Sequence, residues 1–263
     1  NTCPAASHGG MGGPNPGVAG QPTTYGSILS PTNFGSGAYS YGGGAIQATV
    51  AGTTRVDGAI SVKAGPPGLA AAAGGSIYLV TGFLEGSGTL DASSPNFYPS
   101  SPQYGGGGGR IAAILTGSSS FGSVTMKAYG CYPGRPDPFP GAAGTIYKQM
   151  AAQGPGNGTL VVDAGGVVGP TNVTTRLLPS SGTPAYDLKY VTLSLTNAAR
   201  VSLTNDLLMG DVFVRDDTCR LMLNGHYLRL KVSYHANWGT TNRVVYDGGD
   251  IIWGSPGTVV IAR

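Results

Sequence analysis

Four short segments of the chain begin in the same way, and this repetition restricts the fold more than any other feature of the sequence. The four openings are Gly-Gly-Ala-Ile46, Gly-Gly-Ser-Ile77, Gly-Gly-Arg-Ile111 and Ala-Gly-Thr-Ile146. Their isoleucines are 31, 34 and 35 residues apart. Copies at a nearly constant spacing indicate a repeat architecture, in which each copy stacks on the next one.

Each opening is followed by a second segment in which apolar and polar residues alternate. These segments run over 58–64, 88–92, 123–128 and 158–164, and each ends on an alanine. Alternation with a period of two is typical of a strand with one buried face. The Pro- and Gly-rich stretches between the copies, such as 93–109 and 129–144, are predicted to be loops.

The repeat becomes shorter from about Tyr190 onward. Apolar residues there recur 20 or 21 residues apart, from Val191 to Val212, from Val201 to Leu221 and from Leu207 to Leu228. No segment keeps a helical apolar spacing beyond two turns. The chain is therefore predicted to be all-β, a parallel β-solenoid of the right-handed β-helix kind with long Gly/Pro-rich loops.

The predicted organisation has two parts. Residues 1–43 are expected to form a Gly/Pro-rich N-terminal segment or cap. A β-sandwich is the alternative for about this part of the chain. Residues 44–263 form the solenoid, with Gly-rich long coils over 44–170 and tighter coils over 186–263.

The composition excludes several classes of protein. The chain has 46 glycines and 19 prolines, but 40% of its residues are apolar and only 10% are charged, which is not the composition of a disordered segment. A net charge of +3 without a basic stripe gives little basis for nucleic-acid binding. No run of eighteen apolar residues predicts a membrane span. The sequence does not open with a basic region followed by an apolar one, so we expect it to begin as a mature form or an excised domain.

The repeats resemble a known type of sequence. Openings such as Gly-Gly-Ser-Ile77-Tyr-Leu79, second strands such as Gly-Ser-Gly-Thr-Leu90-Asp-Ala92 and the run 105–110 look like the Gly-rich β-strand repeats of large secreted bacterial surface proteins. The segment 221–230 is similar to the L-x-L-N-G-H-x-L-x-L rung of right-handed β-helix passengers and adhesins. The resemblance covers roughly 43–231, and it implies a secreted or cell-surface location and a fold, but no particular activity.

The cysteines and carboxylates allow several interpretations. Cys3, Cys131 and Cys219 predict one disulfide of unknown pairing with a thiol left over, a link to another chain, or three small buried side chains. Asp216 and Asp217, with Asp211 nearby, form an acidic cluster, and Asp247 with Asp250 is a second, similarly weak candidate. A solvated turn is favoured at both over a Ca²⁺ site, so neither a metal nor another cofactor is predicted.

Arginines supply the one candidate ligand site. Arg200 and Arg220 are one short coil apart, which predicts an outward ladder that could bind an acidic glycan, together with the neighbouring residues Arg215, Arg229, Tyr227 and His226. No catalytic residue is predicted, because a single Glu and scattered Asp residues do not suggest the paired carboxylates of a glycoside hydrolase.

The apolar C-terminal strands favour a structural role. The terminal rungs of a solenoid expose unpaired backbone and need a cover. We therefore expect a non-catalytic extracellular structural or adhesive protein, a subunit of a surface fibre or sheath that assembles with copies of itself or within a larger assembly, through Ile251, Ile252, Trp253, Val259, Val260 and Ile261. The alternative is a carbohydrate-binding or polysaccharide lyase-like module acting on acidic glycans.

Overall fold

The structure is a computed structural model, and it describes most of the chain. The described residues are 5–14, 23–66, 70–95, 104–132, 139–177, 188–239, 241–255 and 258–259.

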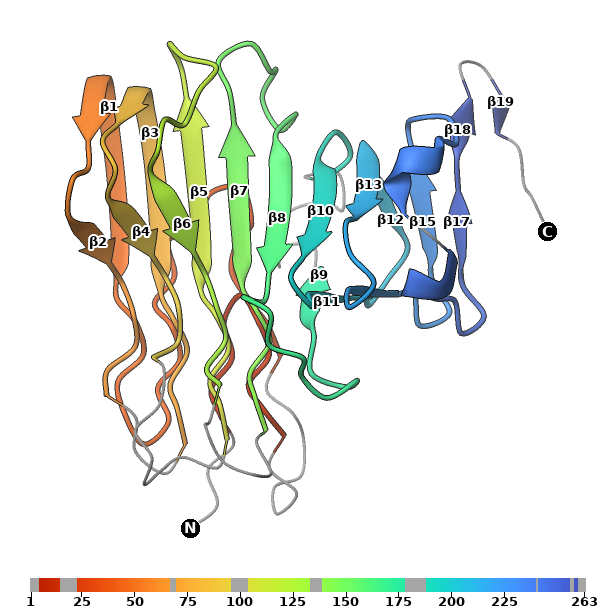
Figure 1. Ribbon diagram of the computed structural model, residues 1–263, viewed down its shortest axis with the longest axis horizontal. Coiled ribbons are helices and arrows are strands. Elements are labelled where there is room, and N and C mark those ends of the chain that lie inside the picture. The colour runs from red at the N-terminus through yellow and green to blue at the C-terminus, as the bar shows by residue number, and fades with distance from the viewer. Residues whose placement is uncertain are drawn as a thin grey trace.

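The largest sheet has seven strands and extends along most of the molecule (Figure 1). Its order is β1-β3-β5-β7-β8-β10-β13, with β1 (Ala45–Arg55), β3 (Ser76–Glu85), β5 (Arg110–Leu115), β7 (Thr145–Gln149), β8 (Thr159–Asp163), β10 (Thr192–Thr196) and β13 (Asp211–Val214). All neighbouring strands of this sheet are parallel except β7 and β8, which are antiparallel.

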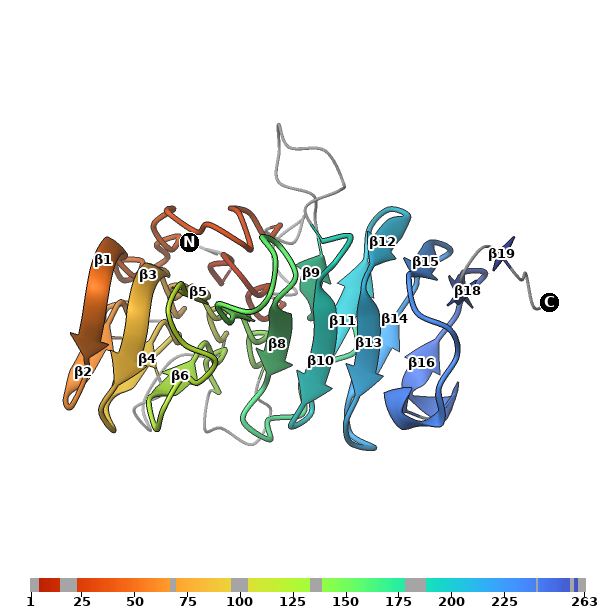
Figure 2. The same ribbon diagram turned by 90° about the horizontal axis from the view of Figure 1, so that it is seen from above.

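Three smaller sheets, all parallel, lie beside the large one (Figure 2). The first has the order β2-β4-β6, with β2 (Ala59–Ser61), β4 (Thr89–Asp91) and β6 (Thr125–Lys127). The second has the order β16-β14-β11-β9, with β9 (Thr175–Leu177), β11 (Arg200–Leu203), β14 (Arg220–Met222) and β16 (Val244–Val245). The third has the order β12-β15-β17, with β12 (Leu207–Met209), β15 (Tyr227–Leu230) and β17 (Asp250–Ile252).

The remaining elements are short. An antiparallel pair joins β18 (Gly254–Ser255) to β19 (Thr258–Val259), and two 3₁₀ helices are η1 (Ala236–Trp238) and η2 (Thr241–Arg243). The described part of the chain contains no α-helix. The prediction of an all-β protein with mostly parallel sheets is thus confirmed.

The strand register follows the sequence repeats. The four opening isoleucines stand side by side across β1, β3, β5 and β7, in register with one another. In the first small sheet Ile60, Leu90 and Met126 form a second ladder. Residues at the same phase of each repeat are therefore stacked, as in a parallel sheet built from copies.

The fourth copy departs from this pattern. Its second strand, β8, leaves the first small sheet and pairs with β7 in the large sheet, with Tyr147 opposite Leu160. The expected alignment of 158–164 with the other second strands is wrong at the level of the sheet. The residue between the two apolar positions shows why: it is polar in the first three copies but Val161 in the fourth, which suits a strand buried on both faces.

The shorter repeats after Tyr190 also find their partners. Val201 lies opposite Leu221 and Leu207 opposite Leu228, as the spacing predicts. Val212, however, lies opposite Leu193 and not Val191, so that step is 19 residues.

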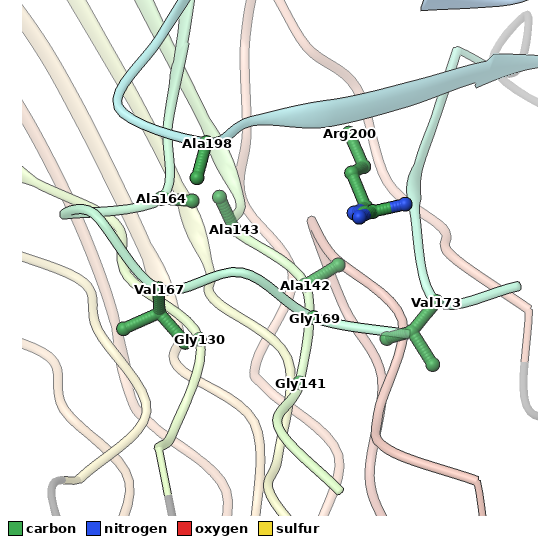
Figure 3. A pocket seen from close by; sticks show the side chains of 10 residues that line it. All are labelled: Gly130, Gly141, Ala142, Ala143, Ala164, Val167, Gly169, Val173, Ala198 and Arg200. Carbon is green, nitrogen blue, oxygen red and sulfur yellow. The ribbon is translucent and has the colours of Figure 1, made fainter. Parts of the chain in front are cut away.

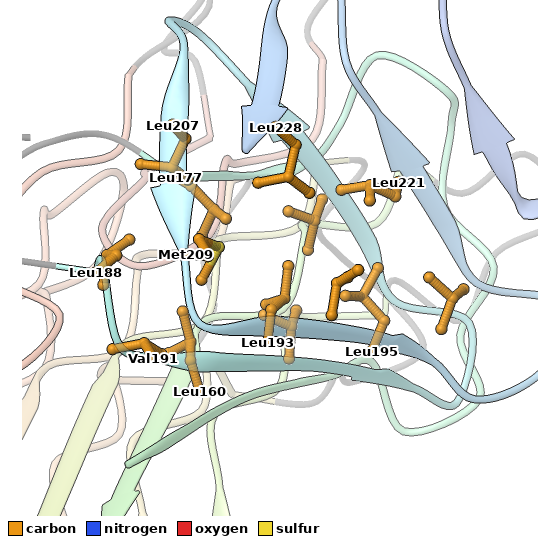
Figure 4. Close-up of a cluster of buried hydrophobic side chains, with 14 of the residues drawn as sticks. Leu160, Leu177, Leu188, Val191, Leu193, Leu195, Leu207, Met209, Leu221 and Leu228 are labelled. Carbon is orange, nitrogen blue, oxygen red and sulfur yellow. The ribbon is translucent and has the colours of Figure 1, made fainter. Parts of the chain in front are cut away.

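Two hydrophobic cores lie on opposite faces of the large sheet. Consecutive residues of a strand point to opposite faces, and Ile146 of β7 belongs to the core shared with the β2-β4-β6 sheet, whereas Tyr147 belongs to the other core. That second core fills the space between β8, β10, β13 and the two remaining small sheets, with the leucines of successive strands in contact (Figure 4). Along the molecule, the face that encloses a core therefore changes where β7 meets β8.

Below the strands of the first half, the chain forms a bundle of Gly- and Ala-rich segments with no regular strand pairing (Figure 1). The central segment, 104–109, exchanges backbone hydrogen bonds with five others, namely 5–13, 70–75, 92–95, 128–132 and 139–144. The stretches expected to be loops are therefore in part a buried layer of the fold. Their glycines are needed for close approach: a Cβ at Gly107 would overlap the carbonyl oxygen of Gly10, and one at Gly108 that of Ala128.

The hydrogen bonds of the central segment repeat every three residues. The amides of Gly105 and Gly108 donate to Phe139 and Ala142 of one neighbour, and their carbonyls accept from residues 13 and 10 of another neighbour. A period of three is that of a polyproline II helix, which has no internal hydrogen bonds and must find partners in other segments when it is buried.

The described part of the N-terminal segment is built into this bundle. Residues 5–12 are buried, and Gly10 donates a hydrogen bond to the Gly108 carbonyl. A division at residue 43 stays a prediction, but 5–12 are not a loose decoration of the repeats.

Candidate functional site

A polar groove crosses the outer face of the β16-β14-β11-β9 sheet. Its volume is about 510 Å³, within the range of small-molecule sites. It is lined by Thr171, Asn172, Thr174, Arg176, Ser202, Leu203, Thr204, Met222, Asn224 and His226. The lining residues come from β9, β11, β14 and the turns at their ends, so the groove runs along the molecule, across three neighbouring strands.

Strand register positions the floor of the groove. Ser202 lies opposite Arg176 on one side and Met222 on the other. The hydroxyl groups of Thr174 and Ser202 are 2.6 Å apart and share a hydrogen bond. Because Val201 and Leu221 of the same strands point into the core, these residues face outward.

A tight turn positions the far end of the groove. Asn224 has a φ of 51° and Gly225 a φ of 79°, so the chain reverses there in the left-handed region. The Asn224 side-chain amide donates to the Leu203 carbonyl at 3.1 Å, which ties this turn to the preceding coil. The turn places His226 at the edge of the groove.

The electrostatic character of the groove is mildly positive. Among the described residues, Arg176 and His226 are the only ionisable ones that line it, and none of those lining residues is a carboxylate. Within the described ranges no carboxylate lies within ion-pairing distance of Arg176. The nearest acid to His226 is Asp206, 3.8 Å from its Nδ1 atom, and Asp206 already accepts a hydrogen bond from the Tyr227 amide.

The structure separates most of the predicted arginines. Arg200 and Arg220 are in register on neighbouring strands, as their spacing predicts, but Arg200 does not face outward as the expected ladder requires. Arg215 follows β13 in the large sheet, where its guanidinium lies 4.0 Å from the centre of the Phe213 ring. Arg229 lies in β15, on the third small sheet. The four side chains therefore do not form one surface, and of the six predicted glycan-binding residues only His226 lines the groove; Tyr227, next to it in β15, is 42% exposed.

Arg200 points into a small hollow between the sheet and the Gly-rich bundle (Figure 3). The hollow is lined mainly by alanine, valine and glycine, and its volume of about 10 Å³ suits about one water molecule. The Arg200 Nε atom is buried without a hydrogen-bond partner in the described structure. Burial, and then the charge of Arg220, lower the pKa of Arg200. This hollow is too small to hold a saccharide.

The predicted assembly residues are largely used by the fold itself. Ile251 and Ile252 are buried in β17, with Ile251 opposite Leu228. Trp253 packs against three rings, those of Tyr234, His235 and Trp238, at centroid distances of 5.4, 5.6 and 5.5 Å. Val259 pairs with Gly254 through the backbone, whereas Val260 and Ile261 lie outside the described residues.

Two of the cysteines are free and buried. Burial raises the pKa of Cys131 to about 12 and that of Cys219 to about 11, so neither is a reactive thiol. Cys3 lies outside the described residues, and a bridge that involves it stays a prediction.

The acidic residues that could have formed a Ca²⁺ site each contact a different set of partners. Burial opposes ionisation of Asp216, but hydrogen bonds from Thr218, Asn197 and Cys219 lower its pKa to about 2. Asp217 accepts from the Arg243 Nε atom at 2.8 Å, and Asp211 is 2.9 Å from the His235 ring. Among the described residues no three His, Cys, Asp or Glu side chains are grouped as metal ligands would be.

Sequence reasoning missed most of the groove. Its Ser, Thr and Asn residues are common types and fall into three groups, near residues 172, 203 and 224, so no single local motif joins the groups. The available signal was the strand register. Arg176, Ser202 and Met222 lie opposite one another, as the apolar residues beside them in the same strands do.

Comparisons with protein-family models, curated proteins and solved structures give no match for this chain. In the described part, no helix is long and apolar enough to cross a membrane.

Proposed function

We propose that this protein is a non-catalytic structural module of an extracellular surface assembly, a parallel β-solenoid that joins copies of itself through the free edge of β1. The resemblance of its repeats to those of secreted bacterial surface proteins supports an extracellular location. The low content of charged residues, 10% of the chain, fits a surface built from Gly, Ser, Thr and Tyr.

The order of the strands supports a solenoid. In the second half the chain passes from the large sheet to the second and then the third small sheet, as β10-β11-β12, and repeats the passage as β13-β14-β15. In the first half it alternates between the large sheet and the β2-β4-β6 sheet, and returns through the Gly-rich bundle.

The reversal at β7 and β8 is compatible with one continuous sense of winding. Strands after this point run opposite to those before it, and the enclosed core changes to the opposite face of the sheet. Each change alone would invert the handedness of the coil, and the two together preserve it. The right-handed sense that parallel crossovers adopt is thus available to both halves.

The observation that carries the assembly proposal is the edge of the large sheet at β1. This strand has 11 residues, pairs with β3 on one side and has no strand on its other side in the described structure. Most of its residues are exposed, including Ile46 at 38%, and Arg55 at its end is its only charged residue. A long edge with few charges and no proline is a template for strand pairing.

The opposite edge of this sheet is covered. The Arg243 Nη1 atom donates to the Val214 carbonyl of β13 at 2.6 Å, and η1 packs beside the same strand with Trp238 buried. The assembly surface we propose is accordingly β1, in place of the C-terminal strands.

The test removes one outward hydrogen-bond donor from β1. The Gly44 carbonyl accepts from Ser76 of β3, and alternate residues point to the same side, so Gln47 and Thr49 direct their backbone groups away from β3. Thr49→Pro therefore blocks an added strand without breaking the β1–β3 pairing. Because the opposite edge is covered, pairing through β1 joins two copies, so we expect the wild-type protein to form a closed dimer and the variant to remain monomeric.

Electron microscopy and light scattering after size-exclusion chromatography measure this outcome, with circular dichroism to confirm that the variant folds. A monomeric wild-type protein, or a folded variant that assembles equally well, would contradict the proposal. Trp253→Ala is the comparison for the C-terminal end, and we expect it to leave assembly intact.

A further inference from the structure

The polar groove on the β16-β14-β11-β9 sheet has no role in the proposed assembly, because β1 belongs to the large sheet. The groove is open to solvent on one side and floored by side chains whose register is fixed by the sheet. Its described lining offers hydroxyl groups, amides, one guanidinium and one imidazole, but no Phe, Tyr or Trp side chain.

The length of the groove suits a polymer better than a compact ligand. It crosses from β9 through β11 to β14, and neighbouring strands are about 4.8 Å apart. Each coil contributes at least one polar group: Asn172 and Arg176 from the first, Ser202 and Thr204 from the second, and Asn224 and His226 from the third. A chain with a repeating set of hydroxyl groups could therefore make similar contacts on each coil.

The charge of the groove selects an acidic ligand. Arg176 presents a planar guanidinium, which binds a carboxylate or sulfate through two hydrogen bonds. In the part of the chain that the structure describes, no carboxylate lines the groove to compete for it. His226 at the far end adds a second donor toward an anionic group.

We infer that this groove binds an extended acidic polysaccharide, with a carboxylate or sulfate on Arg176 and the sugar hydroxyls on Thr204 and Asn224. A single-stranded nucleic acid fits less well, because such sites stack successive bases on several aromatic side chains and His226 is the only ring among the described lining residues. Glycoside hydrolysis is not supported either, because the lining lacks the pair of carboxylates that this reaction uses.

Binding is measured by isothermal titration calorimetry with four acidic polysaccharides, namely polygalacturonate, alginate, hyaluronate and heparan sulfate, and with neutral dextran as the reference. We expect at least one acidic polymer to bind and dextran not to bind. Arg176→Gln is expected to weaken binding about tenfold or more, as loss of a charged hydrogen-bonding partner does. Higher salt is expected to weaken it as well.

Two further variants make the result specific. Asn172→Asp places a carboxylate at an exposed position of the lining, and it is expected to weaken binding without disturbing the fold. Arg215→Gln changes the net charge of the protein by the same amount, but at an arginine beside another sheet. This variant is expected to bind like the wild type. If no acidic polymer binds, if dextran binds equally well, or if Arg215→Gln weakens binding as much as Arg176→Gln does, the inference is wrong.

The same titrations on Thr49→Pro separate this inference from the proposed assembly. The groove lies on a different sheet from β1, so we expect the variant to bind each polymer as the wild type does. Loss of binding in this folded variant would show that the polysaccharide is held by the assembled form and not by the groove of a single chain. Reducing-end assays on the bound polymer should show no new chain ends; cleavage would contradict a site that only binds.

Discussion

His8 and Arg110 are two ionisable side chains inside the Gly-rich bundle, and both are fully buried. The Arg110 Nε atom donates to the Tyr25 carbonyl and its Nη1 atom to the Thr145 hydroxyl, each at 2.9 Å. The His8 Nδ1 atom donates to the Gly74 carbonyl at 2.8 Å, and its ring lies 4.7 Å from that of Tyr25. These contacts tie the N-terminal segment to the repeats.

The position of His8 makes the fold sensitive to acid. Burial, and then the charge of Arg110, lower the pKa of His8 from 6.5 to about 4. The unfolded chain therefore binds a proton more readily, so the stability contributed by neutral His8 is complete above pH 6.5 and is lost as the pH falls toward 4. The shift corresponds to about 3 kcal/mol of unfolding free energy.

We expect His8→Asn, which keeps a donor for the Gly74 carbonyl, to lose less stability between pH 7 and pH 4 than the wild type does. Urea unfolding at a series of pH values measures the difference. Parallel curves for wild type and His8→Asn would show that His8 binds its proton over the same pH range in the folded and the unfolded chain.

At the level of elements, the Gly-rich bundle shows most clearly what local sequence reasoning can and cannot provide. The opening isoleucines predict their own ladder, because copies at one phase of a repeat must stack in register. The bundle is not predicted, because Gly-rich stretches are typical of turns and loops. Its three-residue hydrogen-bond period arises only when several such segments lie side by side.

The second strand of the fourth copy and the groove were missed for similar reasons. Alternation predicts that β8 is a strand but not which sheet it joins, although Val161 at a position that is otherwise polar is a visible clue. The groove depends on residues such as Arg176 and Ser202, which become neighbours only through the register of separate coils. A local pattern identifies strands; the long-range pairing identifies sites.

Because the segments of the bundle are packed at backbone contact, we predict that its central glycines tolerate no side chain. A Cβ at Gly108 would overlap the backbone of both Ala128 and Gly144, and backbone atoms cannot rotate away. We expect Gly108→Ala to lower the free energy of unfolding by about 3 kcal/mol or more. Chemical denaturation measures the change.

Gly58→Ala is the matched control for this substitution. A Cβ at Gly58 would meet no atom within 4 Å. Its effect should stay within about 1 kcal/mol in either direction. Similar losses for the two variants would mean that the segments of the bundle are not packed at backbone contact.

On the scale of the whole molecule, one sheet connects two cores that lie on its opposite faces. Leu90 belongs to the core under the β2-β4-β6 sheet, and Leu193 to the core between β10 and the other small sheets. The two cores meet at β7, where Ile146 packs into one of them and Tyr147 into the other. Neither half can therefore lose its core without exposing a face of the shared sheet.

This arrangement predicts that the two halves unfold together. Leu90→Ala and Leu193→Ala each remove a fully buried side chain, and each should cost about 2–5 kcal/mol. Because the sheet is shared, we expect differential scanning calorimetry to show one transition in the wild type, and each substitution to move that whole transition to lower temperature. Two transitions, with each substitution moving only its own, would instead show that β7 and β8 join two independently stable units, and the shared sheet would then be a seam between domains.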